Sequence, residues 1–165
     1  MGWPVDRINI TQRFGITTDS GRLYASGSHN GMDLGIPVGS AVRSARQGVV
    51  WGTGNTDEQP GCYSYGRWIM VKHDNGLSTL YSHLSSTIVS SGQAVTKGQT
   101  IGYSGGTPGA YGSGYSTGPH LHFGLYATQA TRLQLYTSSI NCKKVVIPMA
   151  DPKAYLDPLS YLPSL

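Results

Sequence analysis

Four of the five histidines lie in patterns suited to binding a metal or moving protons. In the first pattern, the imidazole of His29 precedes the carboxylate of Asp33 by four residues. Gly31 and Pro37 argue against a helix here, so we expect an extended segment in which residues four apart share one face. The pattern therefore predicts an imidazole and a carboxylate that point the same way. A hydrogen-bonded structural pair is the alternative interpretation.

The remaining patterns lie further along the chain. In His120-Leu121-His122, strand alternation places both imidazoles on one face and Leu121 toward the core. Two neighbouring imidazoles repel each other when charged, unless a metal or a proton-transfer role uses them. The same alternation places His83 on the face that carries Tyr81.

These five groups suffice for a hydrolytic metal site. Catalytic zinc takes three protein ligands from His, Asp or Glu and keeps its fourth position for water or substrate. Three ligands would leave two histidines to transfer protons near neutral pH. Spacing alone leaves open whether His120 or His122 touches the metal. A structural zinc site would need four ligands, often thiolates, and the two cysteines are isolated from the histidines in the sequence.

The elements that must position these groups are predicted to be short antiparallel strands. At least five β-rich runs are separated by turn residues, at 47–52, 66–73, 77–84, 93–105 and 119–127. Asn75-Gly76 predicts a hairpin, and His73, just before it, is interpreted as a strand-end residue outside the site. Only short helical pieces are expected, near 151–156 and 158–162. The predicted fold is all-β, an antiparallel sandwich or partly open barrel.

Two segments rich in Gly, Ser, Thr, Pro and Tyr, 53–65 and 104–118, are predicted to be long loops over one end of the sheet. Loops of this length commonly line a site, so we expect a groove between them. Tyr24, Tyr111 and Tyr115 are candidates to line it and to donate hydrogen bonds to substrate. Ordinary exposed loop tyrosines are the alternative.

Composition narrows the partners and the compartment. A net charge of +4 suits an anionic partner, but the basic residues are scattered, so no nucleic-acid surface is predicted. No apolar run is long enough to span a membrane, and a targeting segment is expected to be absent from this chain. Cys62 and Cys142 either form one disulfide in an oxidising compartment or remain two separate buried thiols.

Taken in order along the chain, these strings resemble the M23 family of zinc metalloendopeptidases, the lysostaphin-like or LytM-like domains. The resemblance is carried by HNGMDL at 29–34, GSAV at 39–42, GVV at 48–50, GRWIMVKH at 66–73, LYSHLS at 80–85, GQAV at 92–95, KGQ at 97–99, IGYSG at 101–105 and STGPHLHF at 116–123. It implies one catalytic domain over residues 1–165, with a core at about 10–127 and a C-terminal extension at about 128–165.

The resemblance also implies a role for each candidate. His29 and Asp33 match the H-x-x-x-D ligands of one zinc ion, and His122, the second histidine of H-x-H, matches the third ligand. His83 and His120 match the two histidines that assist catalysis. In such a site zinc polarises the scissile carbonyl and activates a water, whose proton one of these histidines accepts.

The substrate class is implied in the same way. Family members cut peptide bonds of bacterial peptidoglycan, in stem-peptide crosslinks or in cross-bridges, so an extracytoplasmic enzyme is expected in the periplasm, in the cell wall or secreted. We expect it to act as a monomer. The alternative is a non-catalytic LytM-like domain that binds cell wall or activates other wall hydrolases. All five site positions are filled here, which favours the enzyme.

Overall fold

The computed structural model describes residues 1–16, 27–136 and 145–165. In order, the strands are β1 (Ile10–Gln12), β2 (Met32–Leu34), β3 (Ala41–Arg43), β4 (Gly48–Asn55), β5 (Arg67–His73), β6 (Leu77–Ser82), β7 (Leu84–Thr87), β8 (Ala94–Val95), β9 (Thr100–Ser104), β10 (Leu121–Ala127), β11 (Thr131–Leu135), β12 (Val146–Ala150) and β13 (Tyr155–Leu156). The helical turns described are 3-10: η1 (Thr56–Glu58), η2 (Thr128–Ala130), η3 (Pro152–Ala154) and η4 (Pro158–Ser160). No helix among the described residues is long and apolar enough to cross a membrane.

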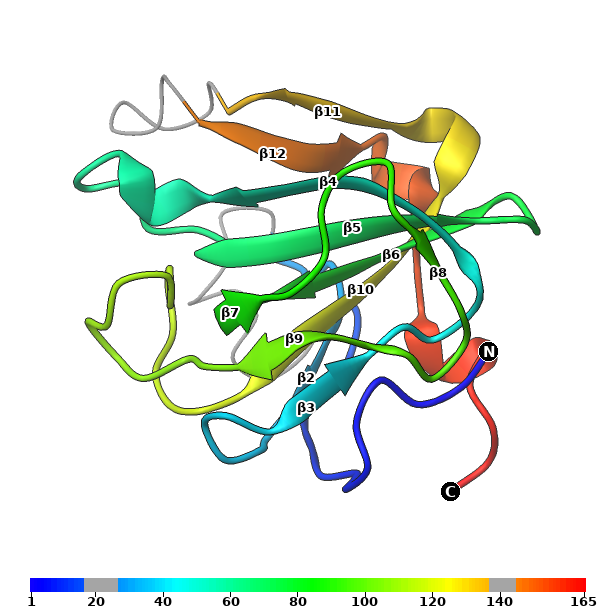
Figure 1. Ribbon diagram of the computed structural model, residues 1–165, viewed down its shortest axis with the longest axis horizontal. Coiled ribbons are helices and arrows are strands. Elements are labelled where there is room, and N and C mark those ends of the chain that lie inside the picture. The colour runs from blue at the N-terminus through cyan, green and yellow to red at the C-terminus, as the bar shows by residue number, and fades with distance from the viewer. Residues whose placement is uncertain (17–26, 137–144) are drawn as a thin grey trace.

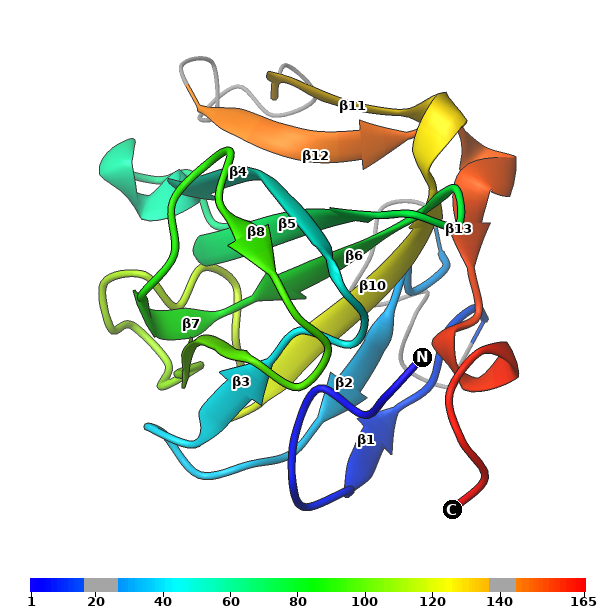
Figure 2. The same ribbon diagram turned by 45° about the vertical axis from the view of Figure 1, so that its right-hand side comes forward.

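The strands form three antiparallel sheets (Figure 1). The largest has the order β1-β2-β10-β6-β5-β4-β8, with β13 added to β10. A second sheet, β3-β9-β7, and the β11-β12 hairpin lie on opposite sides of it (Figures 1 and 2). The large sheet ends at β1 and β8 and does not close on itself. The all-β, antiparallel prediction is therefore confirmed as a layered sandwich, not as a closed barrel.

Each face of the large sheet packs against a different layer, because successive side chains of a strand point to opposite faces. In β10, Leu121 and Phe123 join the core under the three-stranded sheet. Tyr126, three residues after Phe123, joins a second cluster that packs against Leu133 of the β11-β12 hairpin. Burial of a Leu or Phe side chain contributes about 1.5–3 kcal/mol. β10 is thus packed on both faces.

The predicted hairpin is present. β5 and β6 pair antiparallel across it, with Lys72 opposite Ser78. Gly76 adopts φ 76°, a left-handed conformation that glycine takes without a steric penalty. His73 ends β5, where its Nδ1 lies 2.9 Å from the Gln47 carbonyl and its Nε2 lies 2.8 Å from the Thr79 hydroxyl.

Two predicted boundaries were wrong. β4 runs to Asn55, into the segment that was predicted to be a loop from residue 53, because Asn55 still pairs with Arg67 of β5. The run at 93–105 is two strands, β8 and β9, since the chain turns at Gly98 with φ 81°.

The C-terminal extension contains structure that the sequence did not predict. β11 and β12 pair from Thr131 opposite Ala150 to Leu135 opposite Val146. Pro148 is accommodated in β12 because this strand pairs only with β11, so the missing N–H interrupts no second ladder. The expected helical pieces near 151–156 and 158–162 are single 3-10 turns that begin at Pro152 and Pro158, and residues 155–156 form β13 instead.

Candidate metal centre

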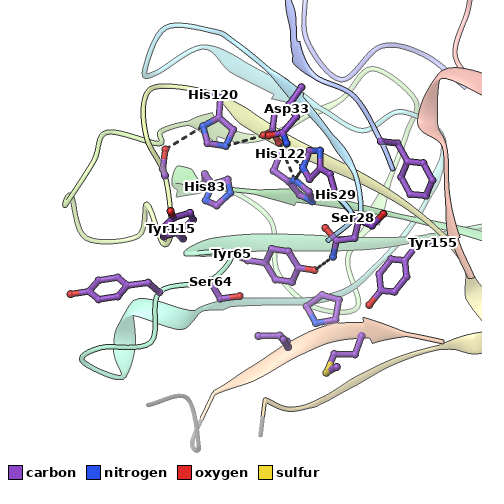
Figure 3. Close-up of a pocket in the computed structure, with 18 of the residues that line it drawn as sticks. Ser28, His29, Asp33, Ser64, Tyr65, His83, Tyr115, His120, His122 and Tyr155 are labelled. Atoms are coloured by element: carbon purple, nitrogen blue, oxygen red, sulfur yellow. Dashed lines mark hydrogen bonds and ion pairs between the residues drawn. The ribbon is translucent and has the colours of Figure 1, made fainter. Parts of the chain in front are cut away.

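The predicted histidines and Asp33 converge on one pocket of about 780 Å³ (Figure 3). The lining includes His29, Asp33, His83, His120 and His122. Asp33 lies in the middle of β2 and is paired directly with His122 of β10. His29 is joined to Gly15 by an isolated antiparallel bridge. The strand pairing of the fold therefore brings together segments that are far apart in the sequence.

Three donor atoms meet at the centre of this pocket. His122 Nδ1 lies 3.0 Å from Asp33 Oδ1 and 3.0 Å from His29 Nε2. His29 Nε2 lies 3.3 Å from the same carboxylate oxygen. An ion held tetrahedrally at about 2.0–2.1 Å spaces its ligand atoms about 3.3 Å apart. The three donors are thus spaced almost as they would be around one small metal ion.

The protonation of His29 supports a cation at this point. Its Nδ1 lies 3.0 Å from the Arg13 carbonyl oxygen, which can only accept a hydrogen bond. In the neutral imidazole Nδ1 therefore carries the proton, and Nε2 presents a lone pair toward Asp33 and His122. Electron-rich atoms that face each other at 3.0–3.3 Å are stabilised when a metal ion binds them. The cluster His29, Asp33 and His122 fits a single metal ion.

Burial and charge set the protonation of the cluster. Burial alone would raise the pKa of Asp33, but its close polar contacts with His122 and His29 outweigh burial and hold this pKa far below its usual range. Burial lowers the pKa of His122, and Asp33 opposes this only partly. A carboxylate beside neutral imidazoles is the protonation state that a metal site requires.

Gly31 gives the His122 ring its space. A Cβ atom at this position would lie 2.6 Å from His122 Cε1 and 2.7 Å from its Nε2. Ordinary van der Waals contacts begin at about 3.4 Å. Any side chain here would push the ring away from Asp33, so the glycine within the H-x-x-x-D motif is a steric requirement of the site.

His83 and His120 lie beside the three donors, with their ring centroids 4.6 Å apart. His120 Nδ1 lies 2.7 Å from the Gly118 carbonyl, and His83 Nδ1 lies 2.7 Å from the Ser113 carbonyl. Because carbonyls only accept, both neutral rings carry the proton on Nδ1 and keep a lone pair on Nε2. His120 Nε2 is 3.9 Å from the second oxygen of Asp33. Two proton acceptors therefore flank the candidate metal position.

The prediction that His83 shares a face with Tyr81 was wrong. Tyr81 is fully buried in the core on the opposite face, where its hydroxyl accepts a hydrogen bond from Ala45 N–H at 2.8 Å. His83 lies between β6 and β7 with φ 59°, the only left-handed non-glycine residue among the described residues. This conformation breaks the alternation of the strand and turns the ring toward His120 and His122.

His83 is held as a neutral base. Burial, together with the neighbouring imidazoles of His120 and His122, lowers its pKa to about 3, although Asp33 and the Ser113 carbonyl oppose the shift. A left-handed non-glycine residue stores strain that commonly accompanies a functional role. Its position is therefore set by its surroundings and not by strand periodicity.

The predicted groove tyrosines have different outcomes. Tyr115 lines the pocket, whereas Tyr111 lines a neighbouring one. Tyr24 lies outside the described residues. Sequence reasoning missed Tyr65, which lines the pocket and accepts a hydrogen bond of 2.7 Å from the Asn30 side chain. Its place in the predicted loop 53–65 was the available signal, but nothing distinguished it from the other tyrosines there.

The outer wall of the pocket comes from the C-terminal extension. Ile147, Pro148 and Met149 of β12 contribute to its lining. No sequence pattern marked them as site residues, because they reach the pocket only through packing of the hairpin over the sheet. Cys62 is buried and disulfide-bonded, and Cys142 lies outside the described residues.

Comparisons with known proteins agree with this geometry. The family model described as Peptidase family M23 matches residues 27–134. The chain is 37% identical over 123 residues to peptidoglycan DD-endopeptidase ShyA of Vibrio cholerae, and the match covers 74% of this chain and 24% of ShyA. It is 39% identical over 95 residues to the DD-carboxypeptidase/endopeptidase Mpg of Neisseria meningitidis, covering 58% of this chain and 19% of Mpg. The chain therefore spans a quarter or less of these curated relatives.

Solved structures show the same fold. The catalytic domain of the antimicrobial peptidase lysostaphin from Staphylococcus simulans aligns with a TM-score of 0.66 at 25% identity, covering 93% of this chain and 91% of that domain. A zinc-containing peptidase from Vibrio cholerae aligns with a TM-score of 0.61 at 30% identity, covering 76% of this chain and 36% of that one. The fold of this chain is therefore shared with known peptidases.

Proposed function

The chain belongs to peptidase family M23, and from this we propose that it is a zinc-dependent endopeptidase that hydrolyses peptide bonds in bacterial peptidoglycan. The observation that carries the proposal is the convergence of His29 Nε2, Asp33 Oδ1 and His122 Nδ1 at 3.0–3.3 Å. Two further imidazoles with free Nε2 lone pairs flank this point. Three ligands and two proton carriers together form a hydrolytic site.

Zinc is the metal that best suits this donor set. Two imidazole nitrogens and one carboxylate oxygen, with one open position, are typical of catalytic zinc. One similar solved structure is described as a zinc-containing peptidase. Manganese, iron and cobalt accept the same ligands. Metal analysis of the purified protein distinguishes them, and zinc at one ion per chain is the expected result.

Zinc bound at this site would polarise the scissile carbonyl and lower the pKa of the attacking water. The protein residues supply the proton transfers. The Nε2 lone pair of His83 or His120 accepts the proton of the water, because each Nδ1–H is already held on a backbone carbonyl. The imidazolium that results donates a proton to the leaving amine or to the oxyanion. Asp33 supplies negative charge to the metal.

The proposed substrate is the peptide part of peptidoglycan, the polymer in the printed name of ShyA. Peptidoglycan lies outside the cytoplasmic membrane, so we propose an extracytoplasmic location: the periplasm, the cell wall or the medium. The disulfide at Cys62 supports an oxidising compartment. We also propose that residues 1–165 act as one catalytic domain and as a monomer.

Digestion of defined peptidoglycan fragments with and without a chelator tests the proposal. New amine ends at one type of peptide bond, identified by mass spectrometry and lost with chelator, are expected. Wall binding without cleavage across several wall types would instead indicate the non-catalytic alternative.

Variants separate the ligands from the proton carriers. Alanine at His29, Asp33 or His122 is expected to remove metal and activity together, since each supplies one of the three donors. Alanine at His83 or His120 is expected to keep zinc bound and to lose most turnover, typically a hundredfold or more, about the contribution of a positioned acid or base. Full activity in either of these two variants would overturn the assigned roles.

A further inference from the structure

A second pocket of about 660 Å³ adjoins the candidate metal centre. It is lined by residues 57–63 and by the 109–116 part of the long loop. Three tyrosines surround it, Tyr63, Tyr111 and Tyr115, with 70%, 65% and 52% of their surfaces exposed. We call these residues the tyrosine rim. Single exposed aromatics are ordinary on a soluble protein, but several around one pocket indicate a binding site.

The rim is continuous with the peptidase groove. Tyr63, Tyr115 and Ser116 line both pockets. Tyr111 lines only the second pocket. A ligand on the rim therefore lies directly beside whatever occupies the groove.

The loop that carries two of the rim tyrosines is held in place by hydrogen bonds. Asp57 Oδ2 accepts from Gly112 N–H at 2.7 Å and from Gly114 N–H at 3.1 Å. Tyr115 N–H donates to the Ser64 carbonyl at 2.8 Å. The Arg67 guanidinium carbon lies 6.0 Å from the ring centroid of Tyr111. The loop is therefore already ordered before a ligand binds, so binding does not have to offset the entropy lost in ordering it.

The chemistry of the second pocket suits an uncharged sugar. Tyrosine rings offer flat apolar faces for the C–H face of a pyranose ring, and their hydroxyls offer polar edges. Glu58 places a carboxylate in the same lining, able to accept from sugar hydroxyls and amides. The described lining contains no Lys or Arg, and Arg67, whose guanidinium lies near the Tyr111 ring, already donates to the Leu84 and Ser85 carbonyls.

An extended peptide is less well matched to this pocket. Peptides commonly add to an exposed strand edge, where the main-chain hydrogen bonds supply affinity. None of the described lining residues of the second pocket belongs to a strand. The aromatic faces, and not backbone groups, are what this surface presents.

We propose that the tyrosine rim binds N-acetylated sugar rings of the glycan strand to which the substrate peptide is attached. The inference rests on the proposed function, because a glycan beside the groove is relevant only if the groove takes peptidoglycan peptide. Stacked sugars on the rim place the attached peptide in the adjoining pocket. The rim therefore raises activity on intact wall above activity on free peptide.

Binding of the N-acetylglucosamine tetramer tests the rim independently of catalysis. Titration calorimetry is expected to show binding by the wild-type protein and about threefold to tenfold weaker binding by Tyr111→Ala, the loss of one aromatic contact. Tyr111→Phe keeps the aromatic face and is expected to bind nearly as well as wild type. Tyr103→Ala is the control, because Tyr103 is 37% exposed on β9 and lines neither pocket.

Hydrolysis gives the second readout. The ratio of the rate on intact wall to the rate on glycan-free crosslinked peptide is expected to fall by the same factor in Tyr111→Ala and to stay constant in Tyr103→Ala. An unchanged ratio, or no tetramer binding by the wild type at millimolar concentration, overturns the inference. Failure of the wild type to cleave either substrate refutes the proposed function instead, and the tetramer titration still decides whether the rim binds sugar.

Discussion

Replacement of Gly31 by alanine is expected to weaken metal binding, because the new Cβ would crowd the His122 ring and would also lie 2.7 Å from the Phe123 carbonyl oxygen. The new Cβ would lie 2.6 Å from His122 Cε1, where ordinary contact begins at 3.4 Å, so the ring has to move by about 0.8 Å. Metal–ligand distances tolerate about 0.2 Å of change. Gly31 is not among the positive-φ glycines, so alanine adds a steric conflict and no backbone strain.

The size of the effect follows from the displaced ligand. Changes that reorient a ligand from outside the coordination shell lower metal affinity about 10–100-fold. At a free zinc concentration of about 100 times the wild-type Kd, binding stabilises the wild-type fold by about 2.7 kcal/mol. The same zinc concentration stabilises a variant with 100-fold weaker affinity by only about 0.4 kcal/mol. Most of the zinc-dependent rise in Tm is therefore expected to disappear.

A competition titration with a chromogenic chelator measures the affinity, and thermal unfolding with and without zinc measures the stabilisation. Gly118→Ala is the matched control, because a Cβ there meets nothing within 4 Å although it lies two residues before His120. Wild-type affinity in Gly31→Ala would refute the reasoning, and so would an equal loss in Gly118→Ala. A large fall in the metal-free Tm of Gly31→Ala would show that the fold, and not the ligand, absorbs the clash.

Three further predictions concern the surroundings of the site. Arg67 donates to the carbonyls of Leu84 and Ser85 at the start of β7, directly after His83. Arg67→Gln should therefore lower kcat about tenfold to a hundredfold with zinc content unchanged. Kinetics with metal analysis check this, and loss of zinc would contradict it. Burial lowers the pKa of His73, so the unfolded state binds the proton more readily, and the free energy of unfolding should fall as the pH drops below about 6.5. Urea unfolding at pH 8 and pH 5 should show a smaller fall in His73→Gln than in the wild type. An equal fall would refute the role of His73. Reduction of the disulfide at Cys62 should lower the free energy of unfolding by about 2–5 kcal/mol. Urea unfolding with and without reductant measures this, and identical unfolding curves would contradict it.

The parts of the site that follow from local geometry could be predicted from sequence. The side chains of His29 and Asp33 point the same way, as predicted, and meet at 3.3 Å. The segment was predicted to be extended and this was wrong, because the chain bends at Asn30 and Gly31 and only 32–34 form a strand. His122 points away from the core that Leu121 joins, as the period of two in a strand requires. Assigning a role to each histidine required the family resemblance in addition.

The parts that depend on tertiary contacts could not be predicted. The conformation of His83 depends on the Ser113 carbonyl, 30 residues away in a loop, and on Arg67, which holds the start of β7. The outer wall of the pocket depends on β12, whose pattern is interrupted by Pro148 and whose partner is β11. Periodicity carries no information about such contacts, because they are set by packing between elements.

The pairing of β2 with β10 is what ties catalytic geometry to stability. The register that sets Asp33 opposite His122 also sets Met32 opposite Phe123 and Leu34 opposite Leu121, all in the core under the three-stranded sheet. A slip of β10 by one residue would turn His122 into that core and expose Leu121 and Phe123. Each lost burial costs about 1.5–3 kcal/mol, so the slip is disfavoured by several kcal/mol before the imidazole is counted. The apolar residues between the ligands therefore fix the metal site, although none of them touches it.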